Sequence, residues 1–173
     1  MTKIYKTGHP NFIIRIADEL DIPLIFHFIK SLAKYEKMLD LVIATEQSLH
    51  KSLFIDKQAE VLIAVENEKP IGFALFYQSF STFQGKANLF LEDLFIEEPY
   101  RNKGYGKLIL SCLALIAKER NYSRIDWWCL DWNQKSIDFY ESLGAVQLKQ
   151  WEVFRLQDQK IFDLSKLIEI YNV

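Results

Sequence analysis

The pattern of apolar and polar residues along this chain predicts strands and helices that follow one another. Residues 12–16 predict a first strand, and residues 21–38 predict an amphipathic helix with apolar residues three and four positions apart. Asp21 is the candidate N-cap of this helix, and Pro23 lies in its first turn. A second helix is expected after Thr45.

The middle of the chain predicts three consecutive strands. They cover residues 60–65, 71–80 and 89–96, and Asn-Glu-Lys-Pro at 67–70 is the expected turn between the first two. A helix with a wide apolar face is expected from Lys103.

The last third of the chain continues the alternation. It predicts a strand over residues 124–130, a short helix over 134–143 that ends at Gly144, and two final strands at 145–148 and 152–156. Because strands interleave with helices, the chain is expected to form an α/β sandwich with a mixed central sheet.

Composition narrows the functional classes. The chain has 173 residues, of which 50% are hydrophobic, so we expect a single domain over residues 1–173 with a polar N-terminal lead at 1–11. The formal net charge is -2 and the basic residues are scattered, which argues against a nucleic-acid partner.

Neither export nor membrane insertion is supported by the sequence. The first twelve residues lack the apolar core of a signal peptide, and no apolar run approaches the ~18 residues of a spanning helix, so we expect a cytoplasmic protein. Cys112 and Cys129 are expected to be buried free thiols. The three histidines are too widely spaced to suggest a metal site.

The most distinctive segment leads from a strand into a helix through Arg101-Asn102-Lys103-Gly104-Tyr105-Gly106. The two glycines allow a ligand close to the backbone, and the first N–H groups of the helix favour an anion. The segment therefore indicates a cradle for an anionic cofactor, although a tight strand-to-helix turn would use the same residues. Neither the P-loop nor the dinucleotide-binding fingerprint is present.

This segment resembles the acyl-CoA pyrophosphate loop of the GNAT superfamily of N-acetyltransferases. Other segments are similar to its diamine (spermidine/spermine) and thialysine branch, and the resemblance covers roughly residues 12–165. These segments are residues 33–38, 71–74, 91–93, 131–133, 137–140 and 143–145. The resemblance implies a three-layer α/β sandwich whose mixed, mostly antiparallel sheet is splayed at the acetyl-CoA site.

The resemblance also implies acetyl-CoA as the acyl-donor cosubstrate and assigns residues to it. The backbone of Leu94, Phe95 and Ile96 would bind the pantetheine arm, and Asn133 would contact the same arm or cap the helix that follows it. The residues expected at the pyrophosphate are Arg101, Asn102, Lys103, Gly104, Tyr105 and Gly106.

Two residues are candidates for catalysis. An amine with a pKa near 10.4 must lose a proton before it attacks, and the resemblance gives this role to Glu92, acting directly or through water. It gives Tyr140 the role of acid for the departing thiolate. Read without the family, Glu92 could be a solvated or salt-bridged edge residue and Tyr140 a core residue. Strand alternation predicts that Glu92 and Asp93 face opposite sides of the sheet.

Acidic and aromatic side chains are expected to recognise the amine. The positions that the resemblance nominates are Tyr35, Glu36, Glu92, Asp93 and Glu152. Glu152 would reach across the interface of a homodimer. Ser81-Thr82-Phe83-Gln84 departs from the vertebrate-type polyamine enzymes, which have an acidic residue and a tryptophan there, so a lysine-like amine stays open.

The expected activity is acetyl transfer to a primary amine of a small polyamine-like or lysine-like substrate, by direct attack in a ternary complex. Two alternatives stay open at this point. The acceptor could be a protein or peptide amine, or the chain could be a non-catalytic acyl-CoA-binding module.

Overall fold

The computed structural model describes residues 3–168 and 170, and it comprises two compact units, Met1–Trp128 and Cys129–Val173. The first unit contains one sheet whose six strands lie in chain order. The strands are β1 (Ile4–Lys6), β2 (Phe12–Ile16), β3 (Glu60–Glu66), β4 (Lys69–Ser81), β5 (Lys86–Ile96) and β6 (Ile125–Trp127). Neighbours are antiparallel except for β5 and β6, which are parallel, so the predicted mixed and mostly antiparallel sheet is confirmed.

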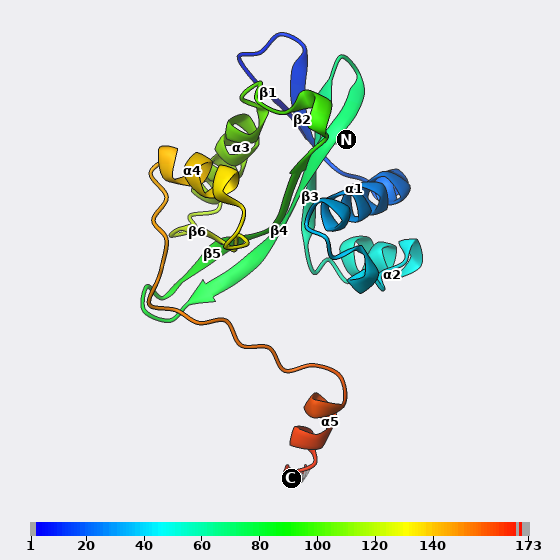
Figure 1. Cartoon of the computed structure of the whole chain (residues 1–173), viewed down its shortest axis with the longest axis vertical. Helices are drawn as coiled ribbons and strands as arrows, with labels where there is room; N and C mark the ends of the chain where they lie inside the picture. The colour runs from blue at the N-terminus through cyan, green and yellow to red at the C-terminus, as the bar shows by residue number, and fades with distance from the viewer. Residues whose placement is uncertain (1–2, 169, 171–173) are drawn as a thin grey trace. The chain divides into compact units, whose positions relative to one another are not determined.

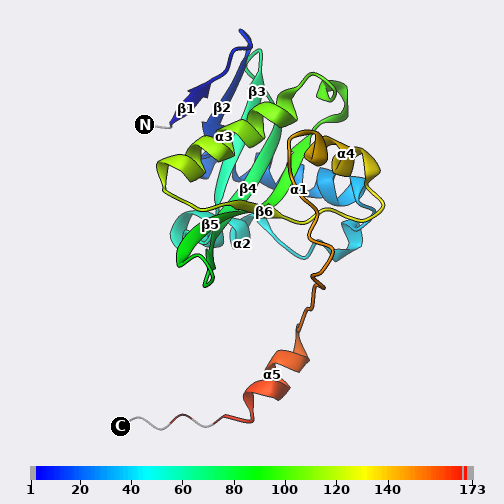
Figure 2. The same ribbon diagram turned by 90° about the vertical axis from the view of Figure 1, so that its left-hand side faces the viewer.

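Helices cover both faces of this sheet. The helices α1 and α2 lie on one face and α3 lies on the other, as Figures 1 and 2 show. The helices and short turns are α1 (Ile22–Tyr35), α2 (Glu46–His50), α3 (Tyr105–Glu119), η1 (Glu19–Asp21), η2 (Leu39–Leu41), the π-helical turn η3 (Lys51–Ile55) and η4 (Glu98–Tyr100). The predicted three-layer sandwich is therefore confirmed. Within the described residues, no helix is long and apolar enough to cross a membrane.

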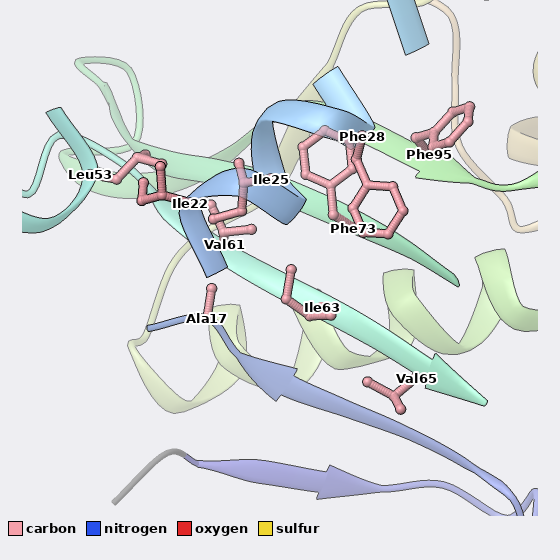
Figure 3. Close-up of a cluster of buried hydrophobic side chains, with 10 residues drawn as sticks. All are labelled: Ala17, Ile22, Ile25, Phe28, Leu53, Val61, Ile63, Val65, Phe73 and Phe95. Carbon is pink, nitrogen blue, oxygen red and sulfur yellow. The ribbon is translucent and has the colours of Figure 1, made fainter. Parts of the chain in front are cut away.

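The core between α1 and the sheet follows from the apolar spacing of the helix (Figure 3). Ile22, Ile25 and Phe28 are three residues apart, so they share one face, and all are buried. The ring of Phe28 stacks on Phe73 at 5.7 Å. The other buried members of this cluster are Ala17, Leu53, Val61, Ile63, Val65 and Phe95. This packing places the end of α1 against β5, where the predicted site residues lie.

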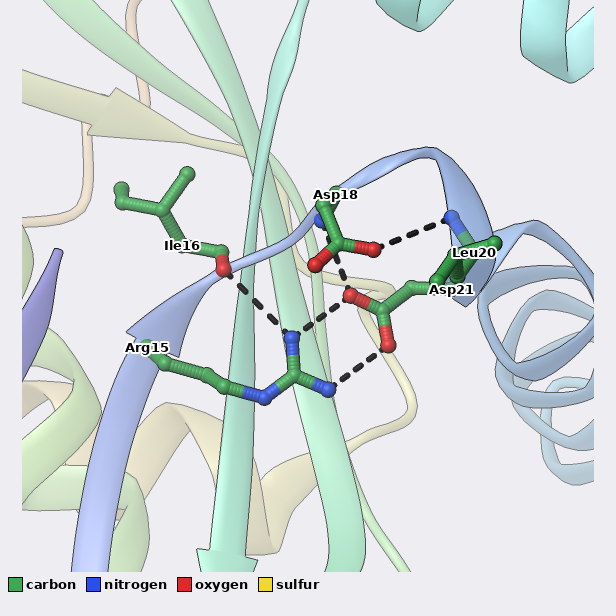
Figure 4. A network of polar contacts seen from close by, with 5 residues as sticks. All are labelled: Arg15, Ile16, Asp18, Leu20 and Asp21. Carbon is green, nitrogen blue, oxygen red and sulfur yellow. Dashed lines mark hydrogen bonds and ion pairs between the residues drawn. The ribbon is translucent and has the colours of Figure 1, made fainter. Parts of the chain in front are cut away.

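The start of α1 differs from the prediction in one detail (Figure 4). Asp21 stands at the N-cap position, but its carboxylate does not cap the helix. Instead it accepts two hydrogen bonds of 2.6 Å from Arg15 and a third from the amide of Asp18. A bidentate bond to a guanidinium is stronger than a neutral cap, which explains the preference. Burial by itself would raise the pKa of Asp21. The hydrogen bonds from Arg15 and Asp18 outweigh this effect, so the pKa lies below its ordinary value.

Several predicted boundaries change in the structure. The stretch at 1–11, expected as a polar lead, contains the strand β1, and the strand expected over 124–130 is shortened to β6. Cys112 is buried as predicted, whereas Cys129 is exposed, so its expected burial is wrong.

The second unit departs most from the prediction. Its helices are α4 (Gln134–Ser142) and α5 (Gln159–Ser165), and α5 was not predicted. Residues 145–148 and 152–156 do not form strands, and nearly all of them are exposed. A strand exists only where a neighbouring strand pairs with it, and an alternating sequence cannot supply that neighbour.

Candidate active site

The segment at residues 101–106, called the phosphate loop below, joins η4 to α3. Asn102 and Gly104 have positive φ angles of 63° and 82°, so the chain turns sharply before the helix begins at Tyr105. The first amide bonded to the turn of α3 is that of Leu108, which donates to Gly104 at 3.2 Å. The amides of residues 104–107 precede it and lack partners within the helix, as at any helix start.

The phosphate loop has room for a ligand. A Cβ atom built on Gly104 would meet nothing within 4 Å. Free amides together with the positive end of the dipole of α3 favour an anion at this point. These features suit an anion, and a diphosphate at this loop stays a prediction.

The edge of β5 opens next to this loop. The strand β6 pairs with β5 only over Leu89–Leu91. In the part of the chain that the structure describes, no strand pairs with residues 92–96 on that side. The sheet is thus splayed where the resemblance placed the cofactor, and the open edge can pair with an extended chain such as an amide-bearing arm.

A β-bulge interrupts β5 at the candidate base. Asp93 lies opposite Leu75 and Leu91 lies opposite Phe76, so Glu92 is the extra residue without a partner on β4. Burial, followed by the negative charge of Glu92, raises the pKa of both Asp93 and Tyr77. Because the bulge breaks the two-residue period, alternation no longer requires Glu92 and Asp93 to face opposite sides of the sheet.

Asp93 belongs to the face of the sheet that α1 covers, since its partner Leu75 packs against the α1 core. Burial, followed by the charges of Glu92 and Glu36, raises the pKa of Asp93 to about 7. Burial also raises the pKa of Glu36, which directly follows α1. The structure thus brings three predicted substrate residues from α1 and β5 within electrostatic reach of one another.

Arg101 lies between the two halves of this site. Its guanidinium is 4.8 Å from the ring centre of Tyr35 and 5.4 Å from that of Phe95. Its Nε donates a hydrogen bond of 2.8 Å to the carbonyl of Ile96. The side chain of Arg101 is thus engaged with α1 and β5, which leaves its backbone as the part that belongs to the phosphate loop.

Two other side chains of the loop, those of Lys103 and Tyr105, meet at a residue that the sequence analysis missed. Tyr105 is buried, and its hydroxyl donates a hydrogen bond to Glu66, the last residue of β3. Lys103 contacts the same carboxylate at 3.2 Å. These partners lie 39 and 37 residues from Glu66. Sequence spacing therefore carried no signal for Glu66, beyond its position before a turn.

The second unit carries the three remaining predicted residues. The side chain of Asn133 accepts a hydrogen bond from the amide of Ser136 at 3.4 Å, so the N-cap alternative is confirmed for this residue. Tyr140 is half-buried on α4, with its ring 5.3 Å from that of Phe139. Glu152 is exposed and lies outside the regular elements.

Comparisons with known proteins agree with this geometry. The acetyltransferase (GNAT) family matches residues 27–145. The L-ornithine N5-acetyltransferase NATA1 of Arabidopsis thaliana is 30% identical, over 93% of this chain and 91% of its own length. The thialysine N-epsilon-acetyltransferase of Bos taurus is 34% identical, over 88% of this chain and 96% of its own length.

A solved structure supports the same assignment. An integron cassette protein from the mobile metagenome of V. cholerae superposes with a TM-score of 0.75 and 28% identity, over 90% of this chain and 98% of that one. The family match covers more than half of the chain, and it includes the phosphate loop and the open edge of β5. The chain therefore belongs to the GNAT acetyltransferase family, in the diamine and thialysine branch, and is an N-acetyltransferase.

Proposed function

We propose that this enzyme transfers the acetyl group of acetyl-CoA to the primary amine of a small lysine-like or polyamine-like substrate, by direct attack in a ternary complex. The observation that carries the proposal is the open edge of β5 beside the phosphate loop, because together they suit an anionic cofactor with an extended amide arm. The cosubstrate supplies an activated thioester, and the protein supplies position and proton transfer.

The cofactor would be held mainly by backbone groups. The amides of the phosphate loop would bind the pyrophosphate, and Leu94, Phe95 and Ile96 would pair with the pantetheine arm. Correct placement can contribute about 7 to 11 kcal/mol to catalysis, which exceeds the contribution of a single acid or base. Holding the thioester still is therefore the main task of this part of the fold.

Three acidic residues near the end of α1 support a cationic acceptor. Glu36, Glu92 and Asp93 place up to three carboxylates near one another, and a substrate ammonium would relieve their mutual repulsion. Glu92 would then accept the proton of the amine, directly or through water. Deprotonating an amine of pKa 10.4 at pH 7 costs roughly 4.6 kcal/mol. A base beside the substrate lowers the activation free energy of this step.

Tyr140 is proposed as the acid that protonates the departing coenzyme thiolate, and Asn133 as a further contact to the arm. The support for both is the family resemblance of the α4 segment. Glu152 is proposed as an acceptor contact contributed across a homodimer. The dimer and a cytoplasmic location stay predictions.

Named relatives guide the choice of acceptors for the test. Purified enzyme is mixed with acetyl-CoA and L-ornithine, thialysine, lysine, putrescine, spermidine or spermine, and release of free thiol is followed. We expect one class of small amine to release thiol at a rate well above the others. Binding of coenzyme A without release by any amine would instead support the binding-module alternative. Acetylation of protein lysines alone, detected by intact mass, would favour the protein-substrate alternative.

A further inference from the structure

The first and last residues of β3 are both glutamates, and each holds one end of α3. Glu60 contacts Arg120, the C-cap residue of α3, with an Nη2 to Oε2 distance of 2.7 Å. Glu66 accepts a hydrogen bond from the hydroxyl of Tyr105, the first residue of the same helix. Figure 2 shows α3 crossing the sheet in front of β3. The helix is therefore fastened to one strand at both of its ends.

The attachment at Tyr105 is rigid. Its ring stacks on Phe12 with a centroid distance of 4.1 Å and an angle of 3° between the planes, and His9 contacts it edge-on at 5.3 Å. Tyr105 is 1% exposed, and the side chain of Glu66 is 11% exposed. A buried hydroxyl that loses its acceptor carries a desolvation cost, so this bond selects one position for the start of α3.

That position matters because Tyr105 stands between Gly104 and Gly106. Glycine backbones are permissive, and this loop needs something outside itself to hold its amides in one arrangement. The side chain of Tyr105 is buried in the protein interior. Its backbone amide is one of the amides at the start of α3 that lack a partner within the helix. The link to Glu66 therefore orients the amides that would face a diphosphate.

We propose that Glu66 is a positioning residue for the cofactor: through Tyr105 it sets the arrangement of the phosphate loop and thereby the affinity for coenzyme A. This inference rests on the proposed function. The charge of Glu66 opposes an anionic ligand, so different changes at Glu66 should shift the affinity for coenzyme A in opposite directions. Removing that charge alone strengthens binding, whereas removing the hydrogen-bond acceptor weakens it.

Calorimetric titration with coenzyme A separates these effects. Glu66→Ala should raise Kd about tenfold or more, because a buried hydroxyl loses a charged acceptor. Glu66→Gln keeps an acceptor for Tyr105 and should bind coenzyme A at least as tightly as the unchanged protein. Tyr105→Phe keeps the ring stack and the charge of Glu66 but loses the bond, so it should raise Kd without the gain that loss of the charge gives to Glu66→Ala. The double variant should be no weaker than either single one, since both break the same contact.

Glu60→Ala is the matched control, since it removes the other terminal glutamate of β3 and its partner contact. Because this pair is exposed, Glu60→Ala should lower Tm by less than Glu66→Ala does, and it should leave Kd for coenzyme A within about twofold of its original value. Equal Kd values for Tyr105→Phe, which breaks the contact but keeps the charge of Glu66, and the unchanged protein would overturn the positioning role while leaving the proposed function intact. Absence of any binding by the unchanged protein would overturn both.

Discussion

The guanidinium of Arg101 lies 4.8 Å from the ring centre of Tyr35, so the first residue of the phosphate loop contacts the last residue of α1. A cation over an aromatic ring, together with the hydrogen bond to Ile96, ties the end of α1, proposed to contact the amine, to the end of β5, proposed to contact the cofactor. If the proposed site is right, Arg101 supports the residues proposed for both substrates.

Arg101→Lys tests this support. Lysine keeps the charge but loses the planar fork that stacks on Tyr35 and bonds to Ile96. We expect the KM values for acetyl-CoA and for the amine to rise together by about tenfold, with a smaller change in kcat. Steady-state kinetics measure this, with Arg124→Lys as control because Arg124, which precedes β6, pairs with Asp126 of that strand. A rise in the KM of acetyl-CoA alone would contradict the shared role.

Gly72 is required by the approach of two strands. A Cβ atom at this position would lie 2.3 Å from the carbonyl oxygen of Phe95, a backbone atom that cannot move aside alone. Gly72→Ala should therefore lower the free energy of unfolding by about 2 kcal/mol or more and weaken coenzyme A binding through displacement of β5. Urea unfolding and calorimetry measure the two effects. Gly8→Ala is the control, since its Cβ would meet nothing, and an equal result for both variants would refute the explanation.

Asp93 should make stability depend on pH. Its folded pKa of about 7 lies above its ordinary value of 3.8, so folding favours the protonated acid. Its contribution is fully present below the unfolded pKa and is lost as pH rises through the folded pKa. Asp93→Asn should therefore become more stable than the unchanged protein as pH rises from about 4 to about 7, by on the order of 3 kcal/mol.

Urea unfolding at several pH values across this window measures the difference. Asp40→Asn serves as the control, because Asp40 is exposed. A stability difference for Asp93→Asn that does not change between pH 4 and pH 8 would show that this carboxyl group titrates normally.

Tyr140→Phe tests the proposed acid. The variant keeps the ring and loses the proton that the leaving thiolate would take, so turnover at saturating substrates should fall by ~10² or more. Tyr122→Phe is the matched control, since its hydroxyl bonds to Gln78 and has no proposed part in the reaction. Unchanged turnover in Tyr140→Phe would remove this residue from the mechanism, and a thiol-release assay decides between these outcomes.

Local patterns in the sequence were sufficient for much of the fold. The strand at 12–16 has the predicted bounds, and α1, β3, β4, β5 and α3 fall within a few residues of theirs. These elements have strong periodicity because each buries one face against the core. The turn of the phosphate loop before α3 was also predicted, since glycine spacing before a helix is a local signal.

Other features depended on contacts between distant parts of the chain. The bulge at Glu92 exists because β5 has one more residue than β4 over the same stretch, and neither strand reveals this alone. The predicted final strands at 145–148 and 152–156 are absent because strand pairing requires a partner. The bond from Tyr105 to Glu66 spans 39 residues. The sequence by itself thus determined most of the helices and strands of the first unit and the place proposed for an anion, because those signals are local. Only the tertiary structure decided which carboxylates meet and what holds the loop, because burial and hydrogen bonding between remote segments arise only when the chain packs.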